Sequence, residues 1–213
     1  MSEAHDHEHD HAHDHEHGHD HVHEHDHDHA HDDAELREEA EADARRRLAL
    51  AQIRQYPDSA LRLVAHEVTD FDDDLRRLAE RMVGLMHEAR GVGLAATQVG
   101  VLRRVFVFEP DPEQDARAIV NPVIVERGDE TASDTEGCLS LQGVNVPVER
   151  ATRVVLEGKD PNGEDVRLEL DGYPARVVQH EIDHLDGVLL IDRTDDEHRK
   201  EALSILRPRV VLR

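Results

Sequence analysis

The chain has 213 residues, which suits one ordinary domain plus a terminal segment, and its formal net charge is −24 at pH 7. The first 44 residues hold 17 acidic side chains against one arginine, and no part of the chain has the basic face that direct binding of duplex nucleic acid requires. The single cysteine excludes an internal disulfide framework, and no apolar run approaches the ~20 residues that span a bilayer, so we expect a cytoplasmic protein without a membrane partner.

Residues 1–33 alternate histidine with aspartate or glutamate, and 14 of the 19 histidines lie in the first 31 residues. This alternation leaves no apolar face to bury, so the segment is predicted to be a disordered tail. Dense histidine tracts bind borderline metals, which predicts labile metal binding there. Delivery of that metal to a catalytic site is one hypothesis for the tail, and a solvated acidic segment without a specific role is the alternative. Residues 34–47 are charged and helix-prone and are predicted to form a connector, ordered only if it docks.

The folded domain, residues 48–213, is predicted to begin with a short strand in LALAQIRQYPD that ends at Pro57. A turn and an extended segment follow. Asp70 or Asp72 can cap a helix through DDLRRLAERMVGLMHEAR, in which apolar residues at three- and four-residue spacing form one buried stripe. That stripe comprises Leu75, Leu78, Met82, Leu85 and Met86. Gly91 and Gly93 are predicted to stop the helix.

Further strands are predicted in RRVFVFE, in AIVNPVIVERG with an interruption at Asn121-Pro122, and on both sides of a turn at residues 160–163. A helix in PARVVQHEIDHLDG has Pro174 in its first turn and Gly187 after its end. A strand in VLLIDR and a helix in DDEHRKEALSIL complete the domain. The predicted fold is α+β, with antiparallel β-sheets packed around a central helix carrying HEIDH, an N-terminal helix and a short C-terminal helix.

The motif QHEIDHLDG places His180 and His184 four residues apart, so a helix presents both imidazoles on one face. Glu181 lies about 100° around the helix from His180, which keeps it out of the ligand pair and lets its carboxylate reach an activated water. Two ligands and a general base in an HExxH pattern are typical of a metal-dependent hydrolase. The alternative is an amphipathic helix with two hydrogen-bonded histidines.

A hydrolytic metal needs a third protein ligand, and the acidic residues and histidine after His184 stand at no diagnostic spacing. Upstream, TEGCLSLQG contains the only cysteine. Cys138 as a thiolate is a strong ligand, and a small buried thiol is the ordinary alternative. In RGVGLAATQVG, small residues let a substrate approach the backbone, and Gln98 is a polar amide among apolar neighbours. A helix stop with a surface glutamine is the alternative for that stretch.

Three motifs resemble, in order, the signature motifs of the peptide deformylase family: GVGLAATQ at residues 91–98, EGCLS at 136–140 and QHEIDH at 179–184. The likeness extends over residues 46–195 and includes YPDSALR, NP, DGYPAR and HLDGVLLIDR. It implies an enzyme that removes the N-formyl group from the initiator methionine of new bacterial polypeptides and releases formate. The implied partners are the nascent N-formylmethionyl polypeptide and, transiently, the ribosome, and a monomer is expected.

The resemblance also implies roles for individual residues. Cys138, His180 and His184 would hold one divalent metal, with Fe2+ expected and Zn2+, Ni2+ or Co2+ able to substitute. Glu181 would act as general base and then as general acid. The side chain of Gln98 and the backbone N–H of Leu139 would stabilise the oxyanion. The residues implied to contact substrate are Val92, Gly93, Gly137, Tyr173 and Arg176.

The chain departs from the family pattern close to the cysteine motif. Gln142-Gly143 replaces a proline that many members have, and Asn145 stands where some relatives carry an arginine that reaches the substrate. These differences bear on side-chain preference. Arg150 and Asp183 are expected to pair, either bracing the site or as a plain salt bridge. Two other classes of function stay open: a metal-sequestering protein built on this fold, and a metallopeptidase that uses HEIDH with another ligand.

Overall fold

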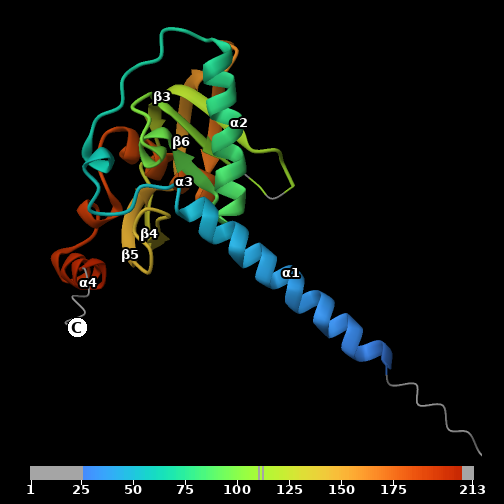
Figure 1. The fold of residues 1–213 in the computed structure, drawn as a ribbon. Helices are drawn as coiled ribbons and strands as arrows, with labels where there is room; N and C mark the ends of the chain where they lie inside the picture. The colour runs from blue at the N-terminus through green and yellow to red at the C-terminus, as the bar shows by residue number, and fades with distance from the viewer. Residues whose placement is uncertain (1–25, 110, 112, 208–213) are drawn as a thin grey trace, which may run out of the picture. The chain divides into compact units, whose positions relative to one another are not determined.

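The computed structural model describes residues 26–109, 111 and 113–207, with side chains from residue 35 onward. The chain divides into two units, residues 1–39 and 40–213, and helix α1 (Asp26–Leu50) crosses this boundary (Figure 1). The helix contains neither glycine nor proline and is rich in alanine, glutamate and arginine, which favours its length. Residues 26–33, for which we expected disorder, are therefore helical, and the rest of the histidine-rich tail lies outside the described residues.

The strand expected in LALAQIRQYPD is wrong, because α1 runs through Leu50 and residues 51–58 form turns. Ala49 and Ile53 are buried, whereas Leu48 is exposed. Burial at residues four apart matches the end of a helix and the turn after it, not the alternation of a strand. The charged segment before Leu48 supplies a helix that the apolar residues continue.

A five-stranded antiparallel sheet, in the order β1-β2-β3-β6-β7, lies at the centre of the second unit. Its strands are β1 (Gly93–Ala95), β2 (Val105–Phe108), β3 (Arg117–Arg127), β6 (Arg153–Lys159) and β7 (Asp165–Asp171). The predicted interruption of β3 is confirmed, since its register with β6 shifts between Val120 and Val123, and Asn121 has φ 51°. The predicted turn at residues 160–163 joins β6 to β7.

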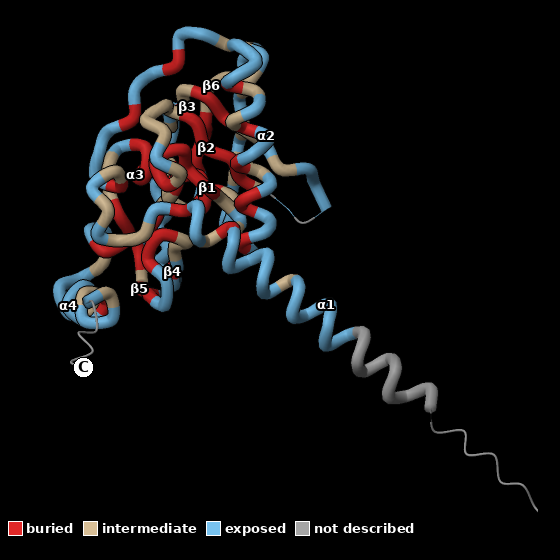
Figure 2. Tube along the Cα trace, viewed as in Figure 1, coloured by how far each residue is buried: buried red, intermediate tan, exposed pale blue. Residues whose placement is uncertain are grey.

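The strand β2 is buried on both faces (Figure 2). Its two valines pack with helix α2 (Asp73–Glu88), and its two phenylalanines pack with helix α3 (Gly172–Leu185). A continuous apolar run such as VFVF is what a strand covered on both sides needs. Each fully buried side chain contributes about 1.5–3 kcal/mol, so this strand anchors both helices.

Helix α2 agrees with the prediction in its start and in its buried face. Asp72 is the N-cap and accepts a hydrogen bond from Leu75 N at 2.9 Å, and most of the apolar stripe is buried. The helix ends at Glu88, before Gly91. Gly93 does not stop the helix but begins β1, so the second glycine of this motif belongs to the sheet.

A second sheet pairs β4 (Thr131–Gly137) with β5 (Asn145–Ala151). We did not predict β4, because TASDTEG is polar and buries only one residue, Glu136. Helix α3 contacts both sheets: it packs on β2 and β6 through apolar residues, and Arg176 donates hydrogen bonds to Val148 O and Ala132 O beside it. The expectation of antiparallel sheets around the HEIDH helix is confirmed, as are Pro174 in its first turn and Gly187 after its end.

The strand expected in VLLIDR is wrong, since this segment forms a 3-10 turn, η3 (Leu190–Asp192). Three consecutive side chains, Leu189, Leu190 and Ile191, are buried, and Asp192 accepts a hydrogen bond from Leu189 N at 2.9 Å. This local bond closes the chain into a turn that buries the apolar run without strand pairing. The C-terminal helix is confirmed as α4 (Asp196–Leu206). No helix among residues 26–207 is apolar over a length that would cross a membrane.

Candidate active site

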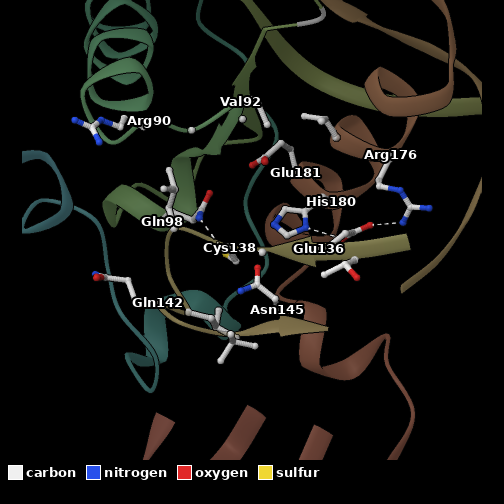
Figure 3. Close-up of a pocket in the computed structure, with 18 of the residues that line it drawn as sticks. Arg90, Val92, Gln98, Glu136, Cys138, Gln142, Asn145, Arg176, His180 and Glu181 are labelled. Carbon is white, nitrogen blue, oxygen red and sulfur yellow. Dashed lines mark hydrogen bonds and ion pairs between the residues drawn. The ribbon is translucent and has the colours of Figure 1, made fainter. Parts of the chain in front are cut away.

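The structure brings Cys138, His180 and His184 together. Cys138 directly follows β4 and lies close to His180 (Figure 3), and His184 lies one turn further along α3. Their candidate ligand atoms all lie within 4.8 Å of one another, and Cys138 Sγ is 3.2 Å from His184 Nε2. One sulfur and two imidazole nitrogens in a partly buried site fit a divalent cation that prefers soft and borderline ligands. The three residues therefore could hold the metal that the sequence suggests.

Protonation of the two histidines differs. Burial and the neighbouring charge of His180 lower the pKa of His184, so its imidazole is neutral, as a metal ligand must be. For His180 burial also opposes the charged form, but hydrogen bonds to Cys138 and Glu136 outweigh burial and raise its pKa. A bound cation would compete with that proton for the ligand atoms of His180 and Cys138.

Glu136 orients His180, and the sequence did not reveal this role. Its Oε2 lies 3.0 Å from His180 Nδ1, so the carboxylate fixes which ring nitrogen faces Cys138. Arg150 donates two hydrogen bonds to Glu136, both at 2.9 Å, and Arg176 donates a third at 2.7 Å. Burial alone would raise the pKa of Glu136, but the hydrogen bonds and charges of Arg150 and His180 hold it well below its usual range. The carboxylate is therefore ionised beside His180.

The expected pair of Arg150 and Asp183 is present and belongs to a larger network. Arg150 Nη1 donates to Asp183 Oδ2 at 2.5 Å while its other nitrogens hold Glu136. Arg193 binds the same aspartate from the opposite side, at 2.5 and 3.1 Å. The network therefore joins α3, which carries both histidines, to the carboxylate that orients His180.

Glu181 is buried next to His180 and faces β1 (Figure 3). A Cβ atom at Gly93 would overlap its Oε1, so only glycine at this position leaves room for the carboxylate. The other oxygen, Oε2, is buried and has no hydrogen-bond partner among the described residues. Burial raises the pKa of Glu181 to about 7. Such a group can accept and return a proton near neutral pH.

Gln98 is fixed beside the cysteine, not exposed on a surface. It lies on the 3-10 turn η2 (Ala96–Val99), where its Oε1 accepts from Ala95 N at 2.8 Å. Its Nε2 donates to Ser140 Oγ at 3.1 Å and lies 3.6 Å from Cys138 Sγ. Leu139 follows Cys138 in the chain, and its carbonyl accepts a hydrogen bond from Gln55 Nε2 at 2.9 Å. The amide of Gln98 and the backbone around Leu139 thus border the metal-ligand group.

A cavity of about 500 Å³ surrounds these groups. It is lined by all five residues expected to contact substrate, which are Val92, Gly93, Gly137, Tyr173 and Arg176. The strand β1 is an edge strand of the large sheet, and residues 91–93, which lead into it, line this cavity, so an extended peptide can pair beside them. Arg176 lines the cavity, but its guanidinium is buried and donates hydrogen bonds to Glu136, Val148 O and Ala132 O. It can therefore shape the cavity wall but does not offer a free donor to a substrate.

Comparison with known proteins gives one consistent family. The model of the polypeptide deformylase family matches residues 50–200. The peptide deformylase of Acidothermus cellulolyticus is 47% identical over 160 residues, which is 75% of this chain and 87% of the relative. That of Thermodesulfovibrio yellowstonii is 42% identical over 149 residues, 68% of this chain and 90% of the relative.

Solved structures agree with the sequence relatives. The peptide deformylase of Thermotoga maritima is similar with a TM-score of 0.65 and 45% identity, covering 67% of this chain and 96% of that one. A peptide deformylase of Plasmodium falciparum, solved with an inhibitor, has a TM-score of 0.67 and 38% identity and covers 72% of this chain and 96% of that one. The residues before 50, including nearly all of α1, fall outside the family match.

Proposed function

The chain belongs to the polypeptide deformylase family, and from this premise we propose that it removes the formyl group from formyl-methionyl polypeptides with Cys138, His180 and His184 holding one divalent cation. Glu181 is the general base and then the general acid in this proposal. One observation carries it: three metal-ligand side chains lie within 4.8 Å of one another beside a buried carboxylate in a cavity of about 500 Å³. Each of these four residues, Cys138, His180, Glu181 and His184, lies in one of the motifs that resemble the signature motifs of the family.

Hydrolysis of an amide needs a nucleophile at neutral pH, and a bound divalent cation supplies one by lowering the pKa of water from 15.7 toward ~7. In the proposed reaction Glu181 would accept a proton from the attacking water and return it to the amine that leaves as the formyl C–N bond breaks. The carboxylate is buried against Gly93 and lines the cavity, which places it beside the reactants.

Negative charge develops on the formyl oxygen during the attack. The side-chain amide of Gln98 and the backbone N–H of Leu139 are the proposed donors to it, and each would contribute about 3 kcal/mol. Gln98 is suited to this role because Ala95 N and Ser140 Oγ hold both ends of its amide. A donor held before the reaction does not have to reorganise when charge appears.

The substrate backbone is proposed to pair along β1 near Val92 and Gly93 on one side and with Gly137 on the other. This arrangement is supported by the free edge of β1 and by the position of both segments in the cavity wall. Tyr173 and Arg176 border the opposite part of the wall, where we place the methionine side chain.

Ferrous iron is the metal we propose, with zinc, nickel or cobalt able to replace it. A thiolate among the ligands suits ferrous iron and makes the site sensitive to oxidation. Elemental analysis after anaerobic purification should find iron in amounts close to one per chain, and activity should fall on exposure to air. Zinc at one per chain in protein kept free of oxygen, with full activity, would contradict the choice of iron.

Formate release from formyl-Met peptides tests the proposal through three proteins. The wild type should be active. Cys138→Ala should lose both activity and tightly bound metal, whereas Glu181→Ala should keep the metal and lose about 10²–10⁴ in rate, the usual effect of removing a general base. His198→Ala is the matched control, because His198 is a partly exposed histidine on α4 outside the cavity, and this variant should retain metal and activity. Robust activity in Cys138→Ala would instead favour a metallopeptidase-like site with another third ligand.

The histidine-rich tail is proposed to bind labile metal, on the strength of its composition alone. Deleting residues 1–25 leaves α1 whole and removes eleven of the fourteen tail histidines. If the tail feeds the active site, the deletion should lower the iron content and activity of protein made in metal-poor medium and have no effect in metal-replete medium. If the truncated protein contained as much iron as the full-length protein in metal-poor medium as well as in metal-replete medium, delivery by the tail would be excluded.

We place the reaction in the cytoplasm, on nascent chains, with the enzyme acting as a monomer that meets the ribosome transiently. Sedimentation of the purified protein alone and with ribosomes tests both points. A stable dimer, or a complex with ribosomes that survives high salt, would contradict this description.

A further inference from the structure

The last turns of α1 border the active-site cavity. Arg46 and Leu50 line the cavity beside Arg90, Gly91 and Val92. Arg46 Nε donates to Ala89 O at 3.4 Å, which ties the last turns of α1 to the loop that leads into β1. Arg46 precedes the residues that the family model matches, which begin at residue 50.

Two guanidinium groups, those of Arg46 and Arg90, lie on the rim of the cavity. Arg46 is exposed and takes part in none of the ion pairs formed by the described residues. Arg90 pairs with Asp43 at 3.3 Å, but both side chains are more than half exposed, so this pair is weak. Deeper in the cavity, by contrast, the guanidinium of Arg176 is buried and paired with Glu136. The rim therefore holds a guanidinium available to a carboxylate from outside.

A polypeptide substrate has to pass this rim. Its formyl group must reach the centre of the cavity at Cys138, and the rest of the chain must leave toward solvent. The chain from Gly93 back through Val92 to Arg90 leads from the centre to the exposed rim, and successive residues of an extended peptide advance about 3.3 Å. The residues that follow methionine in the substrate thus run beside Arg90 and Arg46.

We propose that Arg46, assisted by Arg90, determines specificity by favouring formyl-methionyl polypeptides with an acidic side chain soon after the methionine. The proposal rests on the deformylase function above. The net negative charge of the protein does not oppose it, because physiological salt screens exposed charges beyond about 8 Å and the rim acts locally. Lysine at the same substrate positions meets two guanidinium groups and is disfavoured.

An exposed ion pair supplies a modest effect, so the expected preference is about 1.5- to 5-fold in kcat/KM for acidic over neutral residues. It should shrink as salt rises, since the charges are not buried. A larger or salt-independent preference would have a different origin and would overturn the assignment to the rim.

The test measures formate release from formyl-Met-Ala-X and formyl-Met-X-Ala peptides in which X is Glu, Gln or Lys. Each enzyme is scored by its own ratio of kcat/KM for Glu over Gln, so that changes in overall activity cancel. The ratio should fall to about one in Arg46→Gln, fall below one in Arg46→Glu, and be preserved in Arg46→Lys. Asp43→Asn should increase it by releasing Arg90.

Arg45→Gln is the matched control, because Arg45 lies next to Arg46 on α1, pairs with Glu41 and does not line the cavity. Its ratio should equal that of the wild type. Equal rates with Glu and Gln peptides in the wild type, or an unchanged ratio in both Arg46→Gln and Arg46→Glu, would overturn the inference. Absence of formate release from the Gln peptide in the wild type would instead refute the proposed function itself.

Discussion

Replacing Arg150 by methionine tests whether the buried charge network braces the metal site. The arginine side chain is 5% exposed and makes three hydrogen bonds, two to Glu136 and one to Asp183. If each charged bond contributed 1.5–3 kcal/mol independently, the loss would be about 4.5–9 kcal/mol. Both carboxylates keep another partner, however: Glu136 retains Arg176, and Asp183 retains Arg193. The expected loss is therefore about 3 kcal/mol, the lower end for breaking a buried ion pair.

The same change should reach the metal through His180. With Arg150 absent, Glu136 is held from one side only and the imidazole that it orients becomes less well fixed. Loss of such a supporting contact typically lowers metal affinity about 10- to 100-fold. Urea unfolding of the metal-free protein measures the first effect, and competition with a chromogenic chelator measures the second.

Arg153→Met is the control for this experiment. Arg153 lies on β6, is 48% exposed and pairs with Glu169 at 2.8 Å, so its loss should leave stability and metal affinity close to those of the wild type. A loss of under 1 kcal/mol in Arg150→Met, together with wild-type metal affinity, would refute the bracing role and leave Arg150 and Asp183 as a plain salt bridge.

Three further outcomes follow from the same contacts. Gly93→Ala places a Cβ against Glu181 Oε1 and should lower kcat about 100-fold with metal content unchanged, which steady-state kinetics and elemental analysis would check. Chelation should lower the melting temperature of the wild type because a ligand of the native state stabilises it, and it should leave Cys138→Ala unaffected. Burial would raise the pKa of Asp192, but the hydrogen bonds from Arg62 and Leu189 N and the charges of Arg62 and Arg199 together outweigh burial and lower it. Its stabilisation is therefore present above the unfolded pKa of about 3.9 and is lost as pH falls through the lower folded value, so Asp192→Asn should flatten the decline of unfolding free energy below pH 5; an equally steep decline would contradict this.

Elements that bury a regular apolar pattern could be predicted from the sequence. The stripe of α2, the VFVF run of β2 and the helix that carries HEIDH all have a periodicity that matches one structure. The failures have local causes. Leu48 to Leu50 extend a charged helix, and the apolar run 189–191 is closed into a turn by Asp192. In both segments apolar residues, Ala49 in the first and residues 189–191 in the second, are buried without the pairing that defines a strand.

The site could be predicted to the extent that helix geometry determines it. The spacing of His180 and His184 places two ligands on one face whatever the rest of the fold does. From the residues alone the third ligand stayed open, and Cys138 was singled out by resemblance. Its approach to α3, like the contact between Glu136 and His180, depends on how β4 meets the helix. Contacts across 44 or 46 residues leave no local pattern in a sequence.

The polar strand β4 connects folding to chemistry in this protein. Among its residues only Glu136 is buried, and that carboxylate is bound by Arg150, Arg176 and His180. The register of β4 against β5 therefore determines the position of the Glu136 carboxylate, which orients the proposed metal ligand His180. It also determines the position of Cys138, which follows the strand directly. A slip by one residue would turn Glu136 to the opposite face and move Cys138 by about 3.4 Å along the strand. The metal-ligand group can form only in the native register, so a strand without an apolar pattern is specified by the buried charges it supplies.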